Sequence, residues 1–461
     1  MVPWLIVGGA DKFNHDFVRG LVSSGWEVTI VCTLTADHSW RRSFTKYSSD
    51  IFILSNFLPY AHFPRFIRHL LLTRNPDVVM TSNSGLGYHL MPFLTSSCPQ
   101  AVFVDYAHAE HMGVRVLPWG LGAHGQGAVS VVRHQLRGVE TPARLDGDGR
   151  RCPRESSGLS QVLHVGVIVD DYGRNLIARQ LLRDELKVKE QTTVVTLAAR
   201  LDENKQPGIL CHVATDIVKT QKFQGDVHFL VAGSGDQRLA LKKCIRSKKL
   251  KKKFTMLGYV SLEGMKEVLS ASDVLFLPSQ MEGIPCVFYE AMAAGIPVIG
   301  PGDGGIAELV HNDVTGYVVD VKNGTEFKYK LVSVPEQIKR YSSALMKLLS
   351  NPALARQMGS AGKNVIRTDF NIDRIVEKFI ASVNEKRALK EGGGVCRADP
   401  KRTDKLNEDG KMWWSVRTLA AVTSCVVLQL SYCIVRVLNV QRQLLLCKGF
   451  FTATLLQLTA H

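Results

Sequence analysis

The chain has 461 residues, of which 45% are apolar and 21% are charged. Its length exceeds what one hydrophobic core usually supports, and its composition excludes a disordered or fibrous protein, so we predict two domains and a tail. The formal net charge of +15 at pH 7 favours an anionic partner, without choosing among nucleic acid, anionic lipid and a phosphorylated substrate.

The ten cysteines are scattered along the chain. They form no Cys-x-x-Cys pair and no spacing with histidine that is typical of zinc, so we expect neither a zinc site nor a disulfide framework. Such cysteine usage is typical of a reducing compartment. The N-terminal residues lack the basic segment of a signal peptide, and we therefore predict a cytoplasmic location.

From residue 3 to residue 106, short apolar runs alternate with amphipathic stretches. This alternation predicts βαβ units and a parallel sheet, which would form a first Rossmann-like domain over residues 1–164. Ligands bind at the carboxyl ends of strands in such sheets. The predicted strands are 3–9, 27–33, 50–55, 77–83 and 100–106, and the predicted helices are 13–24, 64–74 and 85–94.

Residues 112–160 break this alternation. They contain nine glycines and seven arginines but no Lys, Phe, Tyr, Ile or Asn, and they show neither a helical nor a strand period. Irregular stretches of this length are rare inside a compact domain. Two interpretations stay open: a gene-model artefact, such as a misread GC-rich exon or a retained intron, or a genuine disordered insertion.

The alternation returns at Val162 and predicts a second Rossmann-like domain over residues 165–388. Its predicted strands are 192–199, 226–232, 254–260, 273–278, 296–300 and 315–320, and its closing helices are 335–349, 353–366 and 371–388. Residues 389–411 are polar and charged, as in a linker. The hydrophobic tail, 412–461, contains an uncharged segment, 418–435, just long enough to span a membrane. It predicts a membrane anchor; a tail that packs on the fold and a doubtful reading frame are the alternatives.

One motif in the second domain carries most of the functional information. Glu282-Gly-Ile-Pro-Cys-Val-Phe-Tyr-Glu290 follows an apolar strand. Gly283 and Pro285 predict a sharp turn into a helix, which places Glu282 before the helix and Glu290 within it. Two carboxylates so placed can each bind a pair of vicinal hydroxyls. One pair would belong to a sugar ring and the other to a ribose. The helix N-terminus beside them offers N–H groups to a phosphate.

This segment resembles the E-x7-E motif of the family 4 glycosyltransferases, which are retaining enzymes of the GT-B fold. Other segments resemble elements of the same family in the same order, and the resemblance covers residues 165–385. They are Arg200-Leu-Asp-Glu-Asn-Lys205, with Ala199 where the family usually has glycine; Val231-Ala-Gly-Ser-Gly235; Leu257-Gly-Tyr-Val-Ser261; and Gly302 to Val310 with Thr315-Gly316-Tyr317.

The resemblance implies a role for each matched residue. Arg200 and Lys205 would bind the donor diphosphate and neutralise the charge that develops as it leaves. Glu282 would bind hydroxyls of the transferred sugar, and Glu290 those of the ribose. Glu308 would support the loop of Gly304 and Gly305. The remaining donor-binding residues implied are Gly233, Gly235, Tyr259, Val260, Gly283, Ile284 and Pro285.

The first domain resembles the family less strongly. Gly8 and Gly9 resemble its first-strand glycine loop, where backbone approaches the donor. Asp105 to His111 resembles the place where the family keeps a histidine near the reacting sugar, and His108 is preferred to His111 because it lies nearer the strand end. The resemblance also implies that this domain is on the acceptor side and that the final helices cross back to it.

The implied architecture is α/β and GT-B, with two Rossmann-like domains facing a cleft and a C-terminal helical tail. The implied reaction moves a sugar from a nucleotide-diphosphate donor to a carbohydrate, lipid or other small acceptor, with retention and with no metal or cofactor. No nucleic-acid partner is implied, and the catalytic domains would face the cytosol. The alternatives are a catalytically impaired nucleotide-sugar-binding protein and a GT-B epimerase or phosphorylase. A dinucleotide oxidoreductase is disfavoured because no G-x-G-x-x-G follows the first strand.

A basic run between Lys242 and Lys253 holds eight lysines or arginines. It is typical of the solvated end of a helix, and the alternative is a contact with anionic lipid.

Overall fold

We analysed a computed structural model of the chain. The structure describes residues 1–107, 129–133, 160–219, 223, 225–280, 282–302, 305–325 and 328–391, with backbone alone at 107, 129–133, 160–162, 322–325, 328–331 and 389–391. All these residues belong to one compact unit.

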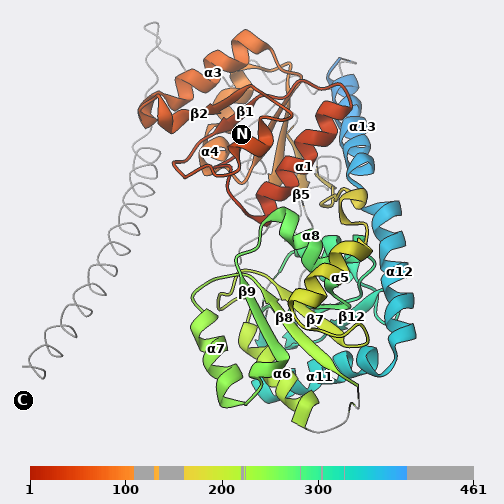
Figure 1. Cartoon of the computed structure of the whole chain (residues 1–461). Coiled ribbons are helices and arrows are strands. Elements are labelled where there is room, and N and C mark those ends of the chain that lie inside the picture. Colours follow the sequence, from red (N-terminus) through yellow and green to blue (C-terminus); the bar gives the residue numbers. More distant parts are fainter. Residues whose placement is uncertain are drawn as a thin grey trace, which may run out of the picture. The chain divides into compact units, whose positions relative to one another are not determined.

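The second domain is built on a six-stranded parallel sheet with strand order β12-β11-β10-β7-β8-β9 (Figure 1). Each of the six strands predicted from the sequence is present, although several are shorter than predicted. They are β7 (Thr193–Ala198), β8 (Val227–Ala232), β9 (Phe254–Gly258), β10 (Val274–Phe276), β11 (Val298–Pro301) and β12 (Gly316–Val319).

Helices cover both faces of this sheet. Successive strand residues point to opposite faces, so Val194 and Ala198 of β7 join one apolar cluster while Val195 and Leu197 join the other. One face carries α6 (Pro207–Lys219), α7 (Arg238–Ser247) and α11 (Val334–Ser350). The other carries α8 (Leu262–Ala271) and α9 (Cys286–Ala293), and α12 (Pro352–Asp369) packs against α9. A sheet covered on both faces explains why its strands are continuously apolar.

The first domain contains a four-stranded parallel sheet, β3-β4-β5-β6, and a parallel pair, β1-β2. Val2 bridges to Cys32 and Ser82 donates its N–H to the Met1 carbonyl, so residues 1–2 join the pair to the sheet. The strands are β1 (Ile30–Cys32), β2 (Ile51–Ile53), β3 (Val78–Ser82), β4 (Val102–Ala107), β5 (Val129–Arg133) and β6 (Ser160–Val162); the helices are α1 (Gly9–Ser23), α2 (Arg41–Phe44), α3 (Phe63–Arg74) and α4 (Gly85–Ser97).

The strand predicted at 3–9 is wrong. Only Val2 makes a strand-like bridge, and α1 begins at Gly9. The backbone of Leu5 bonds instead to the loop that follows β1: its N–H donates to Nδ1 of His38, and its carbonyl accepts the N–H of Trp40. These contacts turn the chain away from a strand ladder before the helix starts.

The prediction that 112–160 contains no regular structure is also wrong at two places. β5 pairs in parallel with β4 on one side and with β6, which begins at Ser160, on the other. The run Val129-Ser-Val-Val-Arg133 has the β-branched composition of a strand, but it is short and flanked by glycine-rich sequence. The rest of the segment lies outside the described residues, and both interpretations of its origin stay predictions.

The expectation of no disulfide framework is contradicted at one pair of cysteines. Cys211 of α6 and Cys244 of α7 form a disulfide with a Cα–Cα distance of 6.5 Å. Thirty-three residues separate them, and only the packing of both helices on one sheet face brings them together. The cysteines therefore no longer argue for a reducing compartment.

The last helix returns to the first domain, as predicted. α13 (Ile372–Glu391) packs along α1 (Figure 1), where the rings of Phe17 and Phe379 lie 5.0 Å apart, and Arg387 pairs with Asp77 at 2.9 Å. α13 runs three residues past the predicted end at 388. No helix in the described part of the chain is long and apolar enough to cross a membrane. The segment 418–435 lies outside that part.

Three elements of the second domain were not predicted. They are a short 3-10 helix, η3 (Val169–Tyr172), the following α5 (Leu176–Glu185), and a hairpin of β13 (Lys322–Thr325) and β14 (Lys328–Leu331). η3 contacts both α8 and α9, so it lies beside the helix that carries Glu290.

Candidate functional site

The loops of the second domain that carry predicted site residues leave the same edge of the six-stranded sheet. Because the strands are parallel, the segments after β7, β8, β9 and β10 meet at the carboxyl edge, where open α/β sheets bind ligands. These loops begin at Ala199, Gly233, Tyr259 and Leu277.

The loop after β8 requires glycine at two positions. Gly233 has φ +143°, and a Cβ there would lie 1.8 Å from the carbonyl oxygen of Ala199. Gly235 has φ +156°, and its Cβ would lie 2.3 Å from the carbonyl oxygen of Leu201. The backbone of this loop therefore lies directly against the loop after β7, and Leu201 donates its N–H to the Ser234 carbonyl. The two loops form one backbone-lined surface at the sheet edge.

Lys205 and Glu282 form an ion pair across this edge. The Lys205 ammonium donates to Oε1 of Glu282, and both side chains are largely buried. The backbone holds the two loops together nearby, since the N–H of Gln280 donates to the Asn204 carbonyl at 2.8 Å. The sequence motif and the basic element that precedes it by 77 residues thus converge on one point.

Arg200 lies on the same loop as Lys205, and its side chain is 77% exposed. Its Nε donates to Oδ2 of Asp202 at 2.6 Å, and Oδ1 of Asp202 accepts the backbone N–H of Lys205 at 3.1 Å. Asp202 therefore orders the loop that carries both cations, while the Arg200 guanidinium stays accessible to an anion.

The turn from β10 into α9 is held by backbone contacts. Gly305 donates its N–H to the Gly283 carbonyl at 2.9 Å, and Ile284 is buried beneath it. Pro285 is the residue immediately before α9, in an extended conformation, so the helix begins at Cys286 as the Gly-x-Pro sequence predicts. The first turn of α9 lies a few residues after Glu282 in the chain.

Glu290 is buried, with 8% of its surface exposed. The phenol of Tyr172, in η3, donates to its Oε1 at 3.0 Å, and Tyr172 is only 2% exposed. Burial raises the pKa of Glu290 above its ordinary value, while the Lys12 ammonium and the Tyr172 hydrogen bond partly offset that rise. The two glutamates of the motif thus have different partners.

Helix α1 of the first domain faces Glu290. Lys12, Asp16, Cys286 and Glu290 line one small cavity. Lys12 pairs with Asp16 and lies 5.7 Å from the centre of the Tyr172 ring. Burial opposes ionisation of Asp16, yet its hydrogen bond with His15 and the pairing with Lys12 lower its pKa below the ordinary value.

The predicted glycine loop of the first domain reaches the same place. The Cys286 thiol donates to the Gly9 carbonyl at 3.4 Å, and a Cβ on Gly9 would lie 3.0 Å from that sulfur. Burial, and then the charge of Glu290, raise the pKa of the Cys286 thiol to about 12, so it stays protonated as a donor. Gly8 lies just before α1.

The structure thus gathers Gly8, Gly9, Lys205, Glu282 and Glu290 around the start of α9, and places the Gly233–Gly235 loop against the loop of Arg200. Tyr259 is 62% exposed and Val260 half-buried after β9. His108 lies outside the described residues. Glu308 pairs its carboxylate with His164 at 2.8 Å.

Sequence reasoning missed the neighbours of Glu290. Lys12 and Asp16 of α1, Tyr172 of η3, and Lys266 of α8, which lies 6.0 Å from the Tyr172 ring, belong to no motif identified above. The only available signal was their amphipathic placement on helices, which also fits ordinary surface residues. Within the described residues, no cluster of three or more His, Cys, Asp or Glu could hold a metal ion.

The comparisons with known proteins agree with this geometry. Residues 178–334 match the family of glycosyl transferases group 1. The chain contains a group 1 glycosyltransferase domain. That domain spans the sheet of β7 to β12, the Lys205–Glu282 pair and Glu290.

Several curated relatives are glycosyltransferases by name. The chain is 27% identical to the amylovoran biosynthesis glycosyltransferase AmsK of Erwinia amylovora, over 51% of this chain and 52% of that protein. It is 25% identical to a GDP-mannose-dependent phosphatidylinositol monomannoside mannosyltransferase of Mycobacterium tuberculosis, over 48% and 54%. The matched region therefore spans about half the length of these relatives.

Solved structures show the fold. The structure of HepE from Anabaena in complex with UDP and glucose aligns with a TM-score of 0.63 at 17% identity, covering 83% of this chain and 98% of that one. Sucrose-phosphate synthase from Thermosynechococcus elongatus aligns with a TM-score of 0.57 at 18% identity, covering 83% and 94%. The α/β fold is GT-B, as the sequence predicts.

Proposed function

We propose that the chain transfers a sugar from a nucleotide-diphosphate donor to an acceptor, with retention of configuration and without a metal ion. The observation that carries this proposal is the pairing of Lys205 with Glu282 at the carboxyl edge of the sheet, beside the exposed Arg200. Two cations, Arg200 and Lys205, next to the Glu282 carboxylate suit a ligand in which a diphosphate is joined to a ring with many hydroxyls.

Two cations have the central role in this mechanism. When the bond between the anomeric carbon and the diphosphate breaks, negative charge develops on the leaving phosphate oxygen. Arg200 and Lys205 lie on one loop ordered by Asp202 and would stabilise that charge without rearrangement. This assignment needs no divalent ion, because the protein supplies two positive charges.

The remaining residues would fix the orientation of the donor. Glu282 would accept hydrogen bonds from hydroxyls of the transferred sugar, and Glu290 from the ribose. The Gly233–Gly235 loop and the N-terminus of α9 offer backbone N–H groups to the phosphates. As the resemblance implies, Tyr259 and Val260 would lie near the base and His108 near the reacting sugar. The backbone of Gly283 to Pro285 and of Gly8 and Gly9 would lie against the donor.

The acceptor is proposed only by class, as a carbohydrate or a lipid-linked sugar. Two relatives support this class: one is named for phosphatidylinositol monomannoside, and one of Escherichia coli for a diphosphoundecaprenol-linked sugar. Association with a membrane through residues 418–435 would suit such an acceptor. Fractionation of the full chain and of a chain ending at 391 tests it, and equal partition of both into the soluble fraction would refute it.

A donor screen tests the central proposal. UDP-, GDP- and ADP-sugars are supplied with candidate acceptors, and release of the nucleoside diphosphate is measured together with the product anomer. Arg200→Ala and Lys205→Ala should each lower turnover about a hundredfold or more, as lost charge stabilisation does. Arg356→Ala, which removes an exposed arginine of α12, is the matched control.

The outcomes separate the alternatives. Donor binding without release under any condition indicates a catalytically impaired binding protein. Isomerisation without acceptor indicates an epimerase, and dependence on inorganic phosphate indicates a phosphorylase. Near-normal turnover in both Arg200→Ala and Lys205→Ala would remove these residues from the reaction.

A further inference from the structure

A basic face lies on the second domain, away from the residues assigned above. We define it as residues 238–253, which comprise α7, the turn after it and the short 3-10 helix η4 (Lys251–Lys253). It contains nine lysines and arginines, and no Asp or Glu occurs between Asp236 and Glu263. A solvated helix usually intersperses both signs of charge, so this composition is unusual for a face that meets only water.

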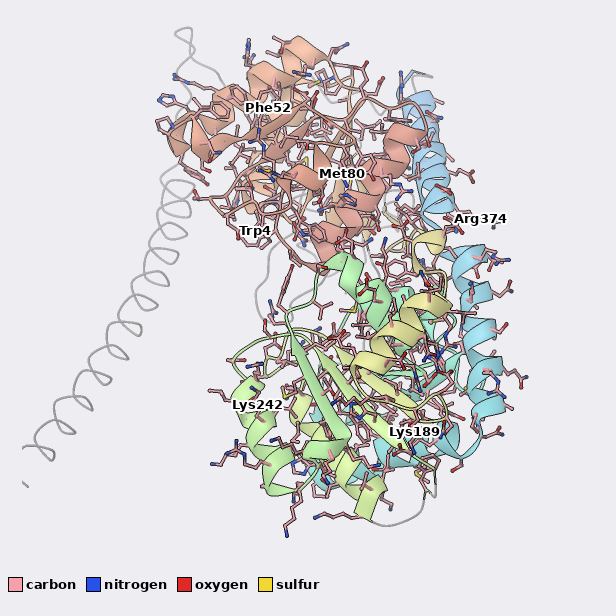
Figure 2. The ribbon with its side chains drawn as sticks, viewed as in Figure 1. Trp4, Phe52, Met80, Lys189, Lys242 and Arg374 are labelled. Carbon is pink, nitrogen blue, oxygen red and sulfur yellow. A yellow bond between two sulfur atoms is a disulfide. The ribbon has the colours of Figure 1, made fainter. Side chains whose placement is uncertain are left out.

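The fold holds this face in a fixed orientation. Leu241 and Ile245 of α7 are buried against the domain, and the Cys211–Cys244 disulfide ties the same side of α7 to α6. Six of the nine cationic residues are exposed and three are half-buried, and Lys242, one of the exposed residues, lies on α7 (Figure 2). Leu239, on the same helix, is 76% exposed and adds an apolar side chain to the basic face.

The charges on this face are almost uncompensated. Of the nine cations, Lys253 alone pairs with a carboxylate in the described part of the chain, that of Asp226 at 2.5 Å. By contrast, Arg179 and Arg183 of α5 both pair with Asp273 and Glu190. The basic face therefore concentrates eight positive charges that no carboxylate in the described part of the chain pairs with.

We propose that the basic face binds the surface of an anionic lipid bilayer. Seven of the nine cations are lysines, which act as mobile point charges and suit diffuse attraction to many headgroups better than bidentate recognition of one ligand. The exposed Leu239 can enter the headgroup region, as apolar residues of interfacial helices do.

Single-stranded nucleic acid fits this face less well. Binding of that kind combines cations with aromatic side chains on which bases stack, and residues 238–253 contain no Phe, Tyr or Trp. The proposal concerns a different part of the chain from the segment 418–435 and does not depend on the proposed glycosyl transfer.

Vesicle flotation with the full chain tests the proposal. Binding is measured to vesicles of phosphatidylcholine alone and to vesicles with about a third phosphatidylserine, at low and high salt. The increment due to phosphatidylserine isolates the electrostatic contact, because an apolar tail would bind both kinds of vesicle. In the charge-removing variant, we expect the extra binding due to phosphatidylserine to fall about a hundredfold or more. The variant carries Lys242→Gln, Lys243→Gln, Lys249→Gln and Lys251→Gln.

Two control variants complete the test. A charge-conserving variant with arginine at the same four positions should keep the increment, which shows that charge rather than a misfolded helix is responsible. A variant that removes four exposed cations from α12 and α13 should also keep it; its changes are Arg356→Gln, Arg367→Gln, Arg374→Gln and Lys378→Gln. Equal increments for the wild type and the charge-removing variant would overturn the proposal. The proposal would also be overturned if RNA homopolymers bound through the basic face while phosphatidylserine did not increase vesicle binding.

Discussion

Replacing Tyr172 with Phe removes one hydroxyl from the centre of the candidate site and leaves the ring in place. The phenol is the donor to Oε1 of Glu290 at 3.0 Å, and both residues are buried. Phe keeps the packing of the ring against α9 and the approach of Lys12 and Lys266. The substitution therefore isolates a single hydrogen bond.

The size of the effect depends on the charge of Glu290. A hydrogen bond to an ionised carboxylate is worth about 1.5–3 kcal/mol, and one to a neutral partner about 0.5–1.5 kcal/mol. Burial raises the pKa of Glu290 in the folded protein. The free energy of unfolding of the wild type therefore falls as the pH rises from the ordinary glutamate pKa to the raised one. Without the phenol that pKa rises further. The loss of stability in Tyr172→Phe should therefore be small in acid and grow toward neutral pH.

Urea unfolding at about pH 4 and about pH 8 measures this difference. Tyr341→Phe is the matched control, since the Tyr341 phenol is fully buried and has no hydrogen-bond partner in the described part of the chain. It should cause no loss in the free energy of unfolding at either pH, because it removes a buried hydroxyl without a hydrogen bond in the described part of the chain. A Tyr172→Phe loss that is equal at both pH values, or no larger than that of Tyr341→Phe, would refute the reasoning.

Three further predictions concern Gln206, Asp11 and the effect of a metal chelator. Gln206 has φ +44°, a left-handed conformation next to Lys205, so Gln206→Gly should raise the free energy of unfolding by about 0.5–1 kcal/mol; a loss in urea unfolding would contradict this. Burial raises the pKa of Asp11 to about 6 from an ordinary value of 3.8, so stability should fall as pH rises between these values. Asp11→Asn should abolish that fall and raise the free energy of unfolding by about 1–2 kcal/mol above pH 6. If the stability of the wild type and of the variant changed in parallel with pH, this prediction would be wrong. Turnover should survive excess EDTA, and loss of activity that Mg²⁺ or Mn²⁺ restores would show the metal-free mechanism to be wrong.

The sheet of the second domain could be predicted from the sequence, although η3, α5 and the β13–β14 hairpin could not. Its strands are apolar runs covered on both faces, so each is conspicuous between helices, and all six were located. The resemblance to the glycosyltransferase family placed Lys205 and Glu282 in one site. The two residues meet because the carboxyl ends of parallel strands lie at one edge of the sheet.

The first domain was harder to predict because its elements are short and depend on distant partners. β5 has five residues within a glycine-rich segment, and its pairing with β4 and β6 makes it a strand. Conversely, the apolar run that includes Leu5 looks like a strand, yet its backbone bonds go to His38 and Trp40 of the loop after β1. In both cases the deciding hydrogen bonds are not local.

The two glutamates of the motif show what spacing can and cannot reveal. Glu282 lies before α9 and meets Lys205 of its own domain, so its environment follows from the order of the sheet. Glu290 lies inside α9 and meets Tyr172, 118 residues earlier, with Lys12 of α1 lining the same cavity. No period within the motif encodes those partners, because they depend on how η3 and α1 pack against α9. Glu290 therefore lies where the second domain meets the first, and its ionisation depends on contacts that both of them supply.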